Sequence, residues 1–471
     1  MPHFVILRRC PIFLALAMLT FTGCIDGGAD TPTPSHATNG QAANANPRKL
    51  RVLVIDDPEF ASALQEFWQT QGDGDLVVDQ KSQTQILPKH RRLGTDIVIF
   101  PCTMLPDMAN RRLLAQVPDE TWSTDFDGKD LLPNARKLCY YDGLSYAVPL
   151  TYSQLQLGYR TDILKAHSID PPKTWSQYMD AVRQLDAVTD TSWTATCEPL
   201  AAGWRSEMFF ARHGSFMKHR KITSILFDTK SLQPQLDNDA GKLAITQLTD
   251  VAKLNPAQLT QSPTNTLREL ISGQTAMAIT LPSANVAGKS DGKSHPLAFV
   301  PLPSSERYYV MRENSWQQRL EIETVPLIGV SSRMAAVAFE SPFKSAAFRL
   351  IATLATSDGY QKVSRGTSTN GITRLSQLRD GDDLIPAALG AKAAQSCRNA
   401  LDRSQGPLAV YTIRLPGRAA YLEKLDKAIE AVISGRDAAE QLHAVENDWN
   451  AISDQNDRDN VLEIYRRSVA Q

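Results

Sequence analysis

Short apolar segments that alternate with a helical pattern constrain the fold of this chain more than any other feature. Residues 50–55 form a largely β-branched run that is typical of a strand buried on both faces. Apolar side chains from Phe60 to Trp68 then recur at helical spacing, and residues 76–78 and 96–100 repeat the strand pattern. Apolar strands that alternate with helices predict an α/β fold with a parallel sheet.

Polar side chains follow two of these predicted strands at the point where each strand ends. Asp56, Asp57 and Glu59 come after the first strand, and Thr103 comes shortly after the strand at residues 96–100. Ligands of α/β sheets bind beyond the carboxyl ends of the strands. We therefore expect Asp57, Glu59 and Thr103 to be ligand-binding residues.

An acidic pair after a first strand is also typical of the phospho-receiver domains of bacterial signalling. The residue that would accept phosphate at the end of the strand at 96–100 is Pro101, whose side chain has no nucleophile. An exported chain would also meet no cytoplasmic kinase. Both observations argue against a receiver domain.

The first 24 residues have the pattern of a bacterial export signal. Arg8 and Arg9 precede a short apolar run at residues 11–22, which is too short to cross a hydrocarbon core of about 30 Å comfortably. Gly23 and Cys24 end this run and resemble a lipobox, which predicts that Cys24 carries a lipid. The alternative is an ordinary cleaved signal. In either case we expect an exported protein, periplasmic or on the cell surface, and the lipobox predicts a membrane anchor.

The segment after the signal predicts a tether rather than a folded element. Residues 25–47 contain almost no large apolar side chain and cannot bury enough surface to fold. The folded body is expected to begin near Lys49. The remainder is longer than one hydrophobic core usually serves, so two domains are expected.

Charge and motif content exclude several classes of function. The 51 acidic residues nearly cancel the 50 Lys and Arg residues, and no block of like charge stands out, so nucleic acid is not an expected partner. The cysteines lack CxxC spacing and nearby histidines, so neither a metal nor a cofactor is expected. No GxSxG, HExxH or Walker-type motif is present, and we do not expect an enzyme.

A series of motifs follows in the second part of the chain. Residues 142–150 read DGLSYAVPL, residues 157–165 read LGYRTDILK, and residues 169–178 read IDPPKTWSQY. ISGQTAMAIT follows at residues 271–280 and YLEKLDKAIE at residues 421–430. In this order and spacing the motifs resemble the extracellular solute-binding proteins of ABC importers, specifically the carbohydrate-type (family 1) branch.

The resemblance implies a two-lobed α/β fold of the type II periplasmic-binding-protein class, with a ligand cleft between lobes joined by crossover hinges. Lobe one would hold residues 49–150 and 327–364, lobe two would hold residues 152–305 and 366–471, and residues 306–326 would form a crossover or insert near the cleft. The implied function is capture of a small polar solute, a sugar or oligosaccharide, for the membrane subunits of an ABC permease. The protein would act as a monomer.

Aromatic residues near predicted loops and hinges are candidates to stack on a sugar ring, with ordinary core packing as the alternative for each. Trp204 follows a loop-like run, Trp316 lies in a polar loop with Glu313, and Tyr152 and Tyr309 flank predicted crossovers. The full set of expected ligand-binding residues is Asp57, Glu59, Thr103, Tyr152, Trp204, Tyr309, Glu313, Trp316 and Asn370.

Several local features also carry expectations. Thr174 is expected to cap a helix in which Trp175 packs in the core. Amphipathic patterns predict helices over residues 335–354 and 422–432.

The four cysteines of the expected body are Cys102, Cys139, Cys197 and Cys397. Two disulfides, each within one implied lobe, and four free thiols are both open.

Two other functions remain as alternatives. A secreted glycan-active enzyme would use Asp56 and Asp57 with Glu59, or Glu313, as paired carboxylates. A solute-sensing binding module would use the same fold without a transporter.

Overall fold

The computed structural model describes residues 49–71, 76–86, 91–189, 192–282, 295–364, 367, 371–380 and 384–469. Cys24 and Asn370 therefore lie outside the described residues. No helix within those ranges is both long and apolar enough to cross a membrane.

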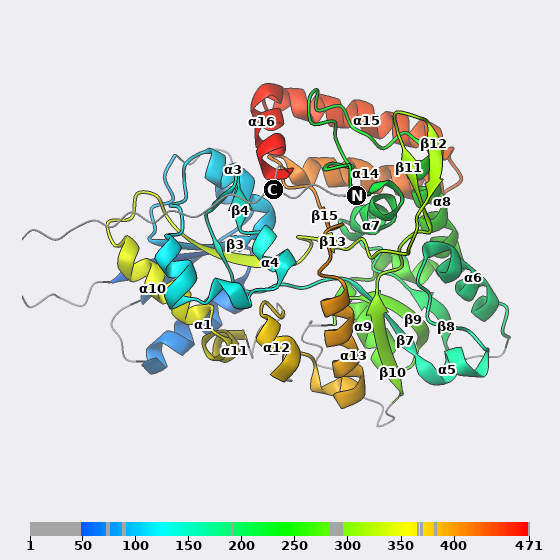
Figure 1. Ribbon diagram of the computed structural model, residues 1–471, viewed down its shortest axis with the longest axis horizontal. Helices are drawn as coiled ribbons and strands as arrows, with labels where there is room; N and C mark the ends of the chain where they lie inside the picture. The colour runs from blue at the N-terminus through cyan, green and yellow to red at the C-terminus, as the bar shows by residue number, and fades with distance from the viewer. Residues whose placement is uncertain are drawn as a thin grey trace, which may run out of the picture. The chain divides into compact units, whose positions relative to one another are not determined.

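A five-stranded sheet forms the first layer of the fold (Figure 1). Its order is β2 (Leu76–Lys81), β1 (Leu50–Ile55), β3 (Ile97–Pro101), β14 (Arg333–Val337) and β6 (Val148–Pro149). β1 runs parallel to both β2 and β3, as the sequence predicts, whereas β14 runs antiparallel to its neighbours β3 and β6. The carboxyl ends of β1, β2 and β3 consequently meet at one edge of the sheet.

A second, four-stranded sheet has the order β10 (Leu297–Pro301), β7 (Gln156–Arg160), β9 (Thr275–Thr280) and β8 (Thr194–Cys197). β8 and β9 are parallel, and β7 is antiparallel to both β9 and β10. The remaining strands form three small pairs: β4 (Tyr140–Tyr141) with β5 (Leu144–Ser145), β11 (Arg307–Val310) with β12 (Ser315–Gln318), and β13 (Leu327–Ile328) with β15 (Val410–Tyr411).

Helices cover both sheets. The described helices are α1 Pro58–Gln71, α2 Gln83–Ile86, α3 Leu105–Asn110, α4 Pro133–Lys137, α5 Thr161–Ala166, α6 Trp175–Asp186, α7 Trp204–Met217, α8 Asp239–Leu254, α9 Pro263–Ile271, α10 Lys344–Leu354, α11 Ser357–Ser364, α12 Leu375–Asp380, α13 Gly390–Arg403, α14 Arg418–Ile433, α15 Ala438–Gln455 and α16 Arg458–Val469. Short 3₁₀ or π turns lie at η1 Cys102–Met104, η2 Thr121–Asp125, η3 Gly128–Asp130, η4 Pro256–Thr260 and η5 Ala387–Leu389.

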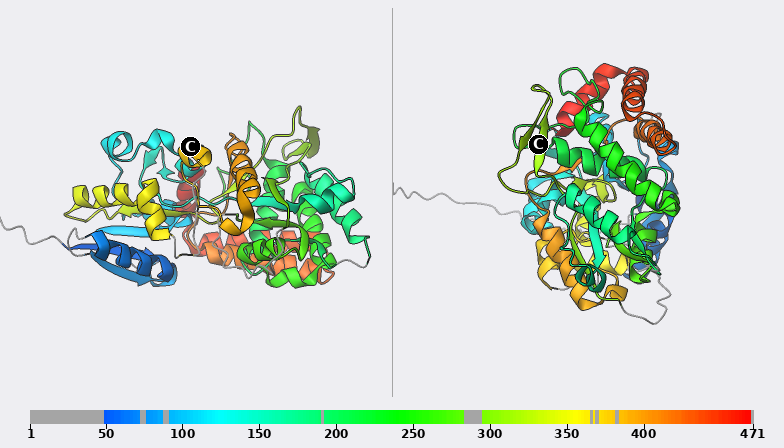
Figure 2. Two further views of the ribbon diagram at one scale, coloured as in Figure 1. Left: turned by 90° about the horizontal axis from the view of Figure 1, so that it is seen from below. Right: turned by 90° about the vertical axis from the view of Figure 1, so that its right-hand side faces the viewer.

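Several helices connect parts of the chain that are distant in sequence. α1 packs on β1 and β2, and α10 packs on β14. α13 lies along β10, and α14 and α15 lie side by side (Figures 1 and 2). The C-terminal helix α16 contacts α3 and β4, so the end of the chain returns to the region built by its first 150 residues.

The chain passes between the two sheets through short segments. Residues 150–155 connect β6 to β7, and residues 329–332 connect β13 to β14. An isolated antiparallel bridge joins Ser153 to Ser331, which places these two segments side by side. This arrangement supplies the connections that a hinge between two lobes needs.

One expected helix is partly wrong. The pattern at residues 335–354 predicts a continuous helix, but residues 335–337 belong to β14 and the helix α10 begins at Lys344. Four residues of this strand, Met334 to Val337, are fully buried, so they show no polar face that would distinguish a strand from a helix.

Other local expectations are confirmed. Thr174 caps α6 in a capping box, with its hydroxyl accepting from the backbone N–H of Gln177, and Trp175 is fully buried. All four described cysteines are buried free thiols. The structure therefore favours four thiols over two disulfides.

Candidate functional site

A polar pocket of about 270 Å³ lies where the carboxyl ends of the first sheet meet the segment between β13 and β14. Its walls come from both ends of the sequence. The lining residues are Asp56, Gln83, Pro101, Thr103, Gly329, Val330, Ser331, Ser332, Arg333 and Arg418. Asp56, Gln83 and Thr103 follow β1, β2 and β3, which is the position that the rule for α/β sheets predicts for a ligand site.

Arg333 fastens the end of β1 to β14. Its Nη1 and Nη2 donate to the carbonyl oxygens of Ile55 and Asp56, both at 2.6 Å, and its Nε lies 2.6 Å from a carboxylate oxygen of Asp57. The other oxygen of Asp57 accepts the backbone N–H of Phe60 at 3.0 Å and so caps the first turn of α1. The guanidinium of Arg333 is therefore occupied by protein groups and serves to shape the pocket.

The backbone conformation and one hydrogen bond orient the side chain of Asp56, which lines the pocket. Its backbone has φ of 53°, in the left-handed region that aspartate tolerates better than most residues. Its side chain accepts the backbone N–H of Gln83 at 3.0 Å, which joins the loop after β1 to the start of α2. A solvated carboxylate beside a loop amide is a suitable acceptor for ligand hydroxyl groups.

Arg418 supplies a cation from the first residue of α14. Its Nε donates to the carbonyl of Ile413 at 3.1 Å, and its Nη2 forms an ion pair with the buried carboxylate of Glu207 on α7. The hydroxyl of Thr412 donates to the same carboxylate at 2.8 Å. Burial raises the pKa of Glu207, and the charge of Arg418 opposes that shift.

Hydroxyl groups and backbone complete the wall between β13 and β14. Ser332 is only 4% exposed, and its Oγ has no hydrogen-bond partner among the described residues. Gly329 has φ of 90°, which favours glycine, and a Cβ there would meet Thr412, Leu138 and the Cys102 sulfur at 3.4–3.6 Å. None of the residues that line this pocket is aromatic.

The cysteine beside Thr103 is not suited to act as a nucleophile. The Cys102 thiol is fully buried and lies 3.4 Å from the carbonyl oxygen of Gly329. Burial raises the pKa of Cys102 to about 11, although several arginines nearby oppose the shift. A thiol with this pKa stays protonated at neutral pH and is a poor nucleophile.

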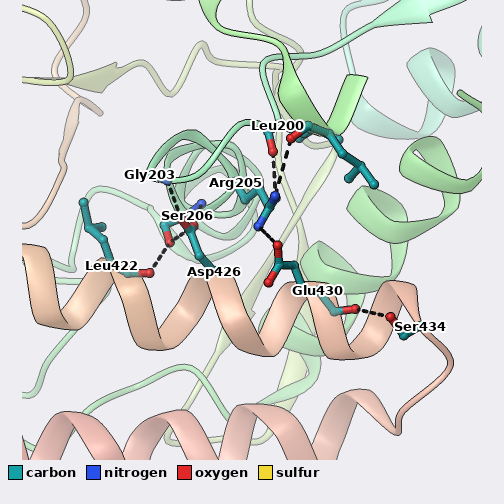
Figure 3. Close-up of polar contacts among 9 residues, drawn as sticks. Leu200, Gly203, Arg205, Ser206, Leu422, Asp426, Glu430 and Ser434 are labelled. Carbon is teal, nitrogen blue, oxygen red and sulfur yellow. Dashed lines mark hydrogen bonds and ion pairs between the residues drawn. The ribbon is translucent and has the colours of Figure 1, made fainter. Parts of the chain in front are cut away.

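The helices that carry Glu207 and Arg418 are locked together by a second set of polar contacts (Figure 3). The carboxylate of Asp426 on α14 accepts the backbone N–H groups of Gly203 and Ser206 and the Ser206 hydroxyl, and so caps the N-terminus of α7 from another helix. Arg205 forms an ion pair with Glu430 one turn further along α14. These contacts fix the relative position of the Glu207–Arg418 pair.

The expected ligand-binding residues lie in several places. Thr103 lines the pocket, and Asp57 lies behind it in the contact with Arg333. Glu59 is an exposed residue in the first turn of α1. Trp204 is the half-buried first residue of α7.

Tyr152 is fully buried, and its hydroxyl bonds to Gln154 at 2.7 Å beside a separate small cavity.

The remaining expected residues belong to the hairpin of β11 and β12. Trp316 packs edge-on against Phe216 of α7 and against Tyr309, with ring centroids 6.0 and 5.4 Å apart, and the guanidinium of Arg307 lies 4.4 Å from its ring centroid. Glu313 is exposed and accepts from Gln317 at 2.7 Å. These contacts are sufficient to explain the hairpin aromatics by packing.

Sequence reasoning missed Arg333, Arg418 and the serines at 331 and 332. The resemblance places the return of the chain to lobe one at residue 327, and this was the available signal for Ser331 and Ser332. Among the described residues no group of three or more His, Cys, Asp or Glu side chains is arranged to hold a metal ion.

A family model and several solved structures all relate this chain to solute-binding proteins. Residues 63–384 match the model of the bacterial extracellular solute-binding proteins. An ABC transporter solute-binding protein from Agrobacterium radiobacter, solved with ribitol, is 15% identical, with 86% of this chain and 98% of that chain covered and a TM-score of 0.62.

Two further solved structures share the fold. One is an ABC transporter solute-binding protein from Agrobacterium vitis with bound D-mannitol, at 17% identity, 87% and 99% coverage and a TM-score of 0.59. The other is an ABC substrate-binding protein from Listeria monocytogenes in complex with cycloalternan, at 15% identity, 86% and 99% coverage and a TM-score of 0.60. At these identities the likeness establishes the fold.

Proposed function

Because the chain belongs to the bacterial extracellular solute-binding proteins, we propose that it captures a small sugar or polyol for an ABC-type importer. Its pocket supports a ligand rich in hydroxyl groups. Asp56, Gln83, Thr103, Ser331 and Ser332 offer acceptors and donors of the kind that hydroxyl groups need. The three related proteins were solved with ribitol, D-mannitol and cycloalternan, which supports the same ligand class.

The size of the pocket supports a ligand no larger than a monosaccharide. A volume of about 270 Å³ lies just below the range for small-molecule sites, about 300–1,000 Å³. An oligosaccharide would need further subsites outside this pocket. We therefore favour a linear polyol or a single sugar ring over an oligosaccharide.

The two lobes would close on this ligand. We retain the division into residues 49–150 with 327–364 and residues 152–305 with 366–471, with the short connecting segments as hinges. The ligand would touch strand ends of lobe one and Arg418 of lobe two, so its binding energy would favour the closed state. Trp204 would supply an aromatic face from lobe two on closure.

A panel of polyols and monosaccharides tests the proposal by thermal shift. A true ligand at about 100 times its Kd should stabilise the protein by about 2.7 kcal/mol. Absence of a shift across pentitols, hexitols, pentoses and hexoses, with a shift for an amino acid or peptide instead, would redirect the proposal to another solute.

Membrane attachment is a separate part of the proposal. Cys24 would carry the lipid, and residues 25–47 would tether the body near the permease subunits. Cys24→Ala should move the protein from the membrane fraction to the soluble exported fraction, with Cys10→Ala as the matched control. Unchanged fractionation of Cys24→Ala would leave a plain export signal.

A further inference from the structure

A second and larger cavity, of about 740 Å³, lies away from the strand-end pocket. Its walls are the η3 turn with the preceding Asp127, the helix α12 and one face of α13. It shares no lining residue with the strand-end pocket. Any ligand of this cavity would therefore be recognised by a different set of side chains.

Arg398 on α13 is the group in this cavity whose bonding is incomplete. The residue is only 9% exposed, and its Nη2 donates to Gln395 at 2.7 Å. Its Nε is buried without a hydrogen-bond partner, and it forms no ion pair among the described residues. A buried guanidinium without a counter-charge is unfavourable, so an anion beside it would be stabilised.

Two other cations line the same cavity. Lys129 and Arg379 are exposed, and neither has an ion pair within the part of the chain that the structure describes. Asp130, in contrast, is already held by Arg374 at 3.6 Å and by the N–H and hydroxyl of Ser376.

Two more carboxylates line the cavity, and both remain in contact with water. Asp127 and Asp402 are exposed side chains, so solvent screens their charge. The buried charge of Arg398 is screened much less. The balance of charge around Arg398 therefore favours an anion.

We propose that this cavity binds a small organic anion, with its carboxylate or phosphate group on Arg398. The planar fork of a guanidinium matches both groups. Leu375 and Leu378 also line the cavity and provide apolar contact for the carbon skeleton, which favours an organic anion over a bare inorganic ion.

Calorimetric titration of the whole protein with citrate and with glycerol 3-phosphate tests this site, with sodium chloride at matched ionic strength as the blank. One of the two probes should bind with a stoichiometry of one, and the one that binds identifies the anionic group. Arg398→Gln should weaken this binding by about ten-fold or more, because hydrogen bonds to charged groups are the strong ones. Arg403→Gln, an exposed arginine on the same helix outside the cavity lining, should leave it unchanged.

Arg379→Gln tests the same site if Arg398→Gln folds poorly. Arg379 is exposed, so its replacement should not affect folding. It should weaken probe binding and leave the unfolding temperature unchanged. The proposal is overturned if neither probe binds the wild-type protein at about 10 mM, a concentration that would partly fill even a site with a Kd in the millimolar range. It is also overturned if binding is the same in Arg398→Gln, Arg379→Gln and Arg403→Gln.

Discussion

Arg333 shows how a single residue can shape a ligand pocket through its contacts with the protein itself. Its guanidinium contacts two carbonyl oxygens at the end of β1 and the carboxylate of Asp57. Asp57 is 4% exposed, so removal of its partner would leave a buried charge. The pair is therefore expected to determine both stability and the shape of the pocket.

Arg333→Met should destabilise the protein by about 3–5 kcal/mol, the usual effect of breaking a buried ion pair from one side. Asp57→Asn combined with Arg333→Met should recover part of this loss, because no unpaired charge remains. Urea denaturation of the single and double variants measures both effects. Equal destabilisation in both would show that the charge of Asp57 is not the cause.

His213 gives the stability of the protein a defined dependence on pH. The side chain is fully buried on α7 and stacks on Phe209 with ring centroids 5.4 Å apart. Burial lowers the pKa of His213 to about 3, from an ordinary value of 6.5. Between these two values the unfolded chain binds a proton that the folded chain excludes, so stability falls as pH decreases below about 6.5.

His213→Phe should remove this contribution. The slope of unfolding free energy against pH, measured between pH 6.5 and 4.5, should become shallower by about 1 kcal/mol per pH unit. Phe209→Leu, at the ring that stacks on His213 and carries no titratable group, is the control and should change the slope little. An unchanged slope in His213→Phe would mean that the folded protein accepts the proton.

At the level of secondary structure, the contact between α7 and α14 positions Arg418, which lines the candidate site opposite the strand ends of the first sheet. The carboxylate of Asp426 caps the start of α7 and is 6% exposed. Glu207 and Arg418 extend from these same two helices. The geometry of the ion pair at the pocket therefore depends on a cap that lies outside it.

Asp426→Ala should destabilise the protein by about 2 kcal/mol or more, since it leaves the N–H groups of Gly203 and Ser206 without their acceptor. Asp448→Ala removes a carboxylate from an exposed ion pair on α15 and should cost about 1 kcal/mol or less. Thermal unfolding of the two variants makes the comparison. A similar loss in both would contradict the role given to Asp426.

The sequence predicted the elements whose patterns are local. β1 spans residues 50–55 as expected, because its side chains are almost all apolar and a turn follows directly. The cap at Thr174 was equally readable, since its donor, the backbone N–H of Gln177, lies three residues away. Residues 335–337 of β14 were predicted to be helical, because their side chains are all buried and apolar and suit either structure.

The candidate site was only partly predictable, because its residues meet through long-range contacts. Thr103 was found from the rule on strand ends, but Arg333 lies 277 residues from its acceptor Asp56, and Arg418 lies 211 residues from Glu207. No local pattern distinguishes these arginines from the others in the chain. Trp316 illustrates the converse, since a polar sequence context suggested exposure and the structure places it against Phe216.

For the whole molecule, two sheets with distinct helical layers meet at the segment between β13 and β14. The strand-end pocket lies there, with one wall from the first sheet and a cation from α14. A binding protein needs such a position, because ligand contacts on both sides convert binding energy into closure. We propose that this pocket binds a neutral sugar or polyol without chemical change.

Calorimetric titration of wild type, Thr103→Val and Thr246→Val tests this proposal, with the polyol or monosaccharide that gives the largest thermal shift as the ligand. Thr103 lines the pocket, whereas Thr246 is exposed on α8 and serves as the control. We expect one binding site in wild type and recovery of the ligand intact. Thr103→Val should bind about three- to ten-fold more weakly, because the hydrogen bond of the hydroxyl is lost, and Thr246→Val should bind with wild-type affinity. Equal affinity in all three proteins, or ligand that is consumed during the titration, would contradict it.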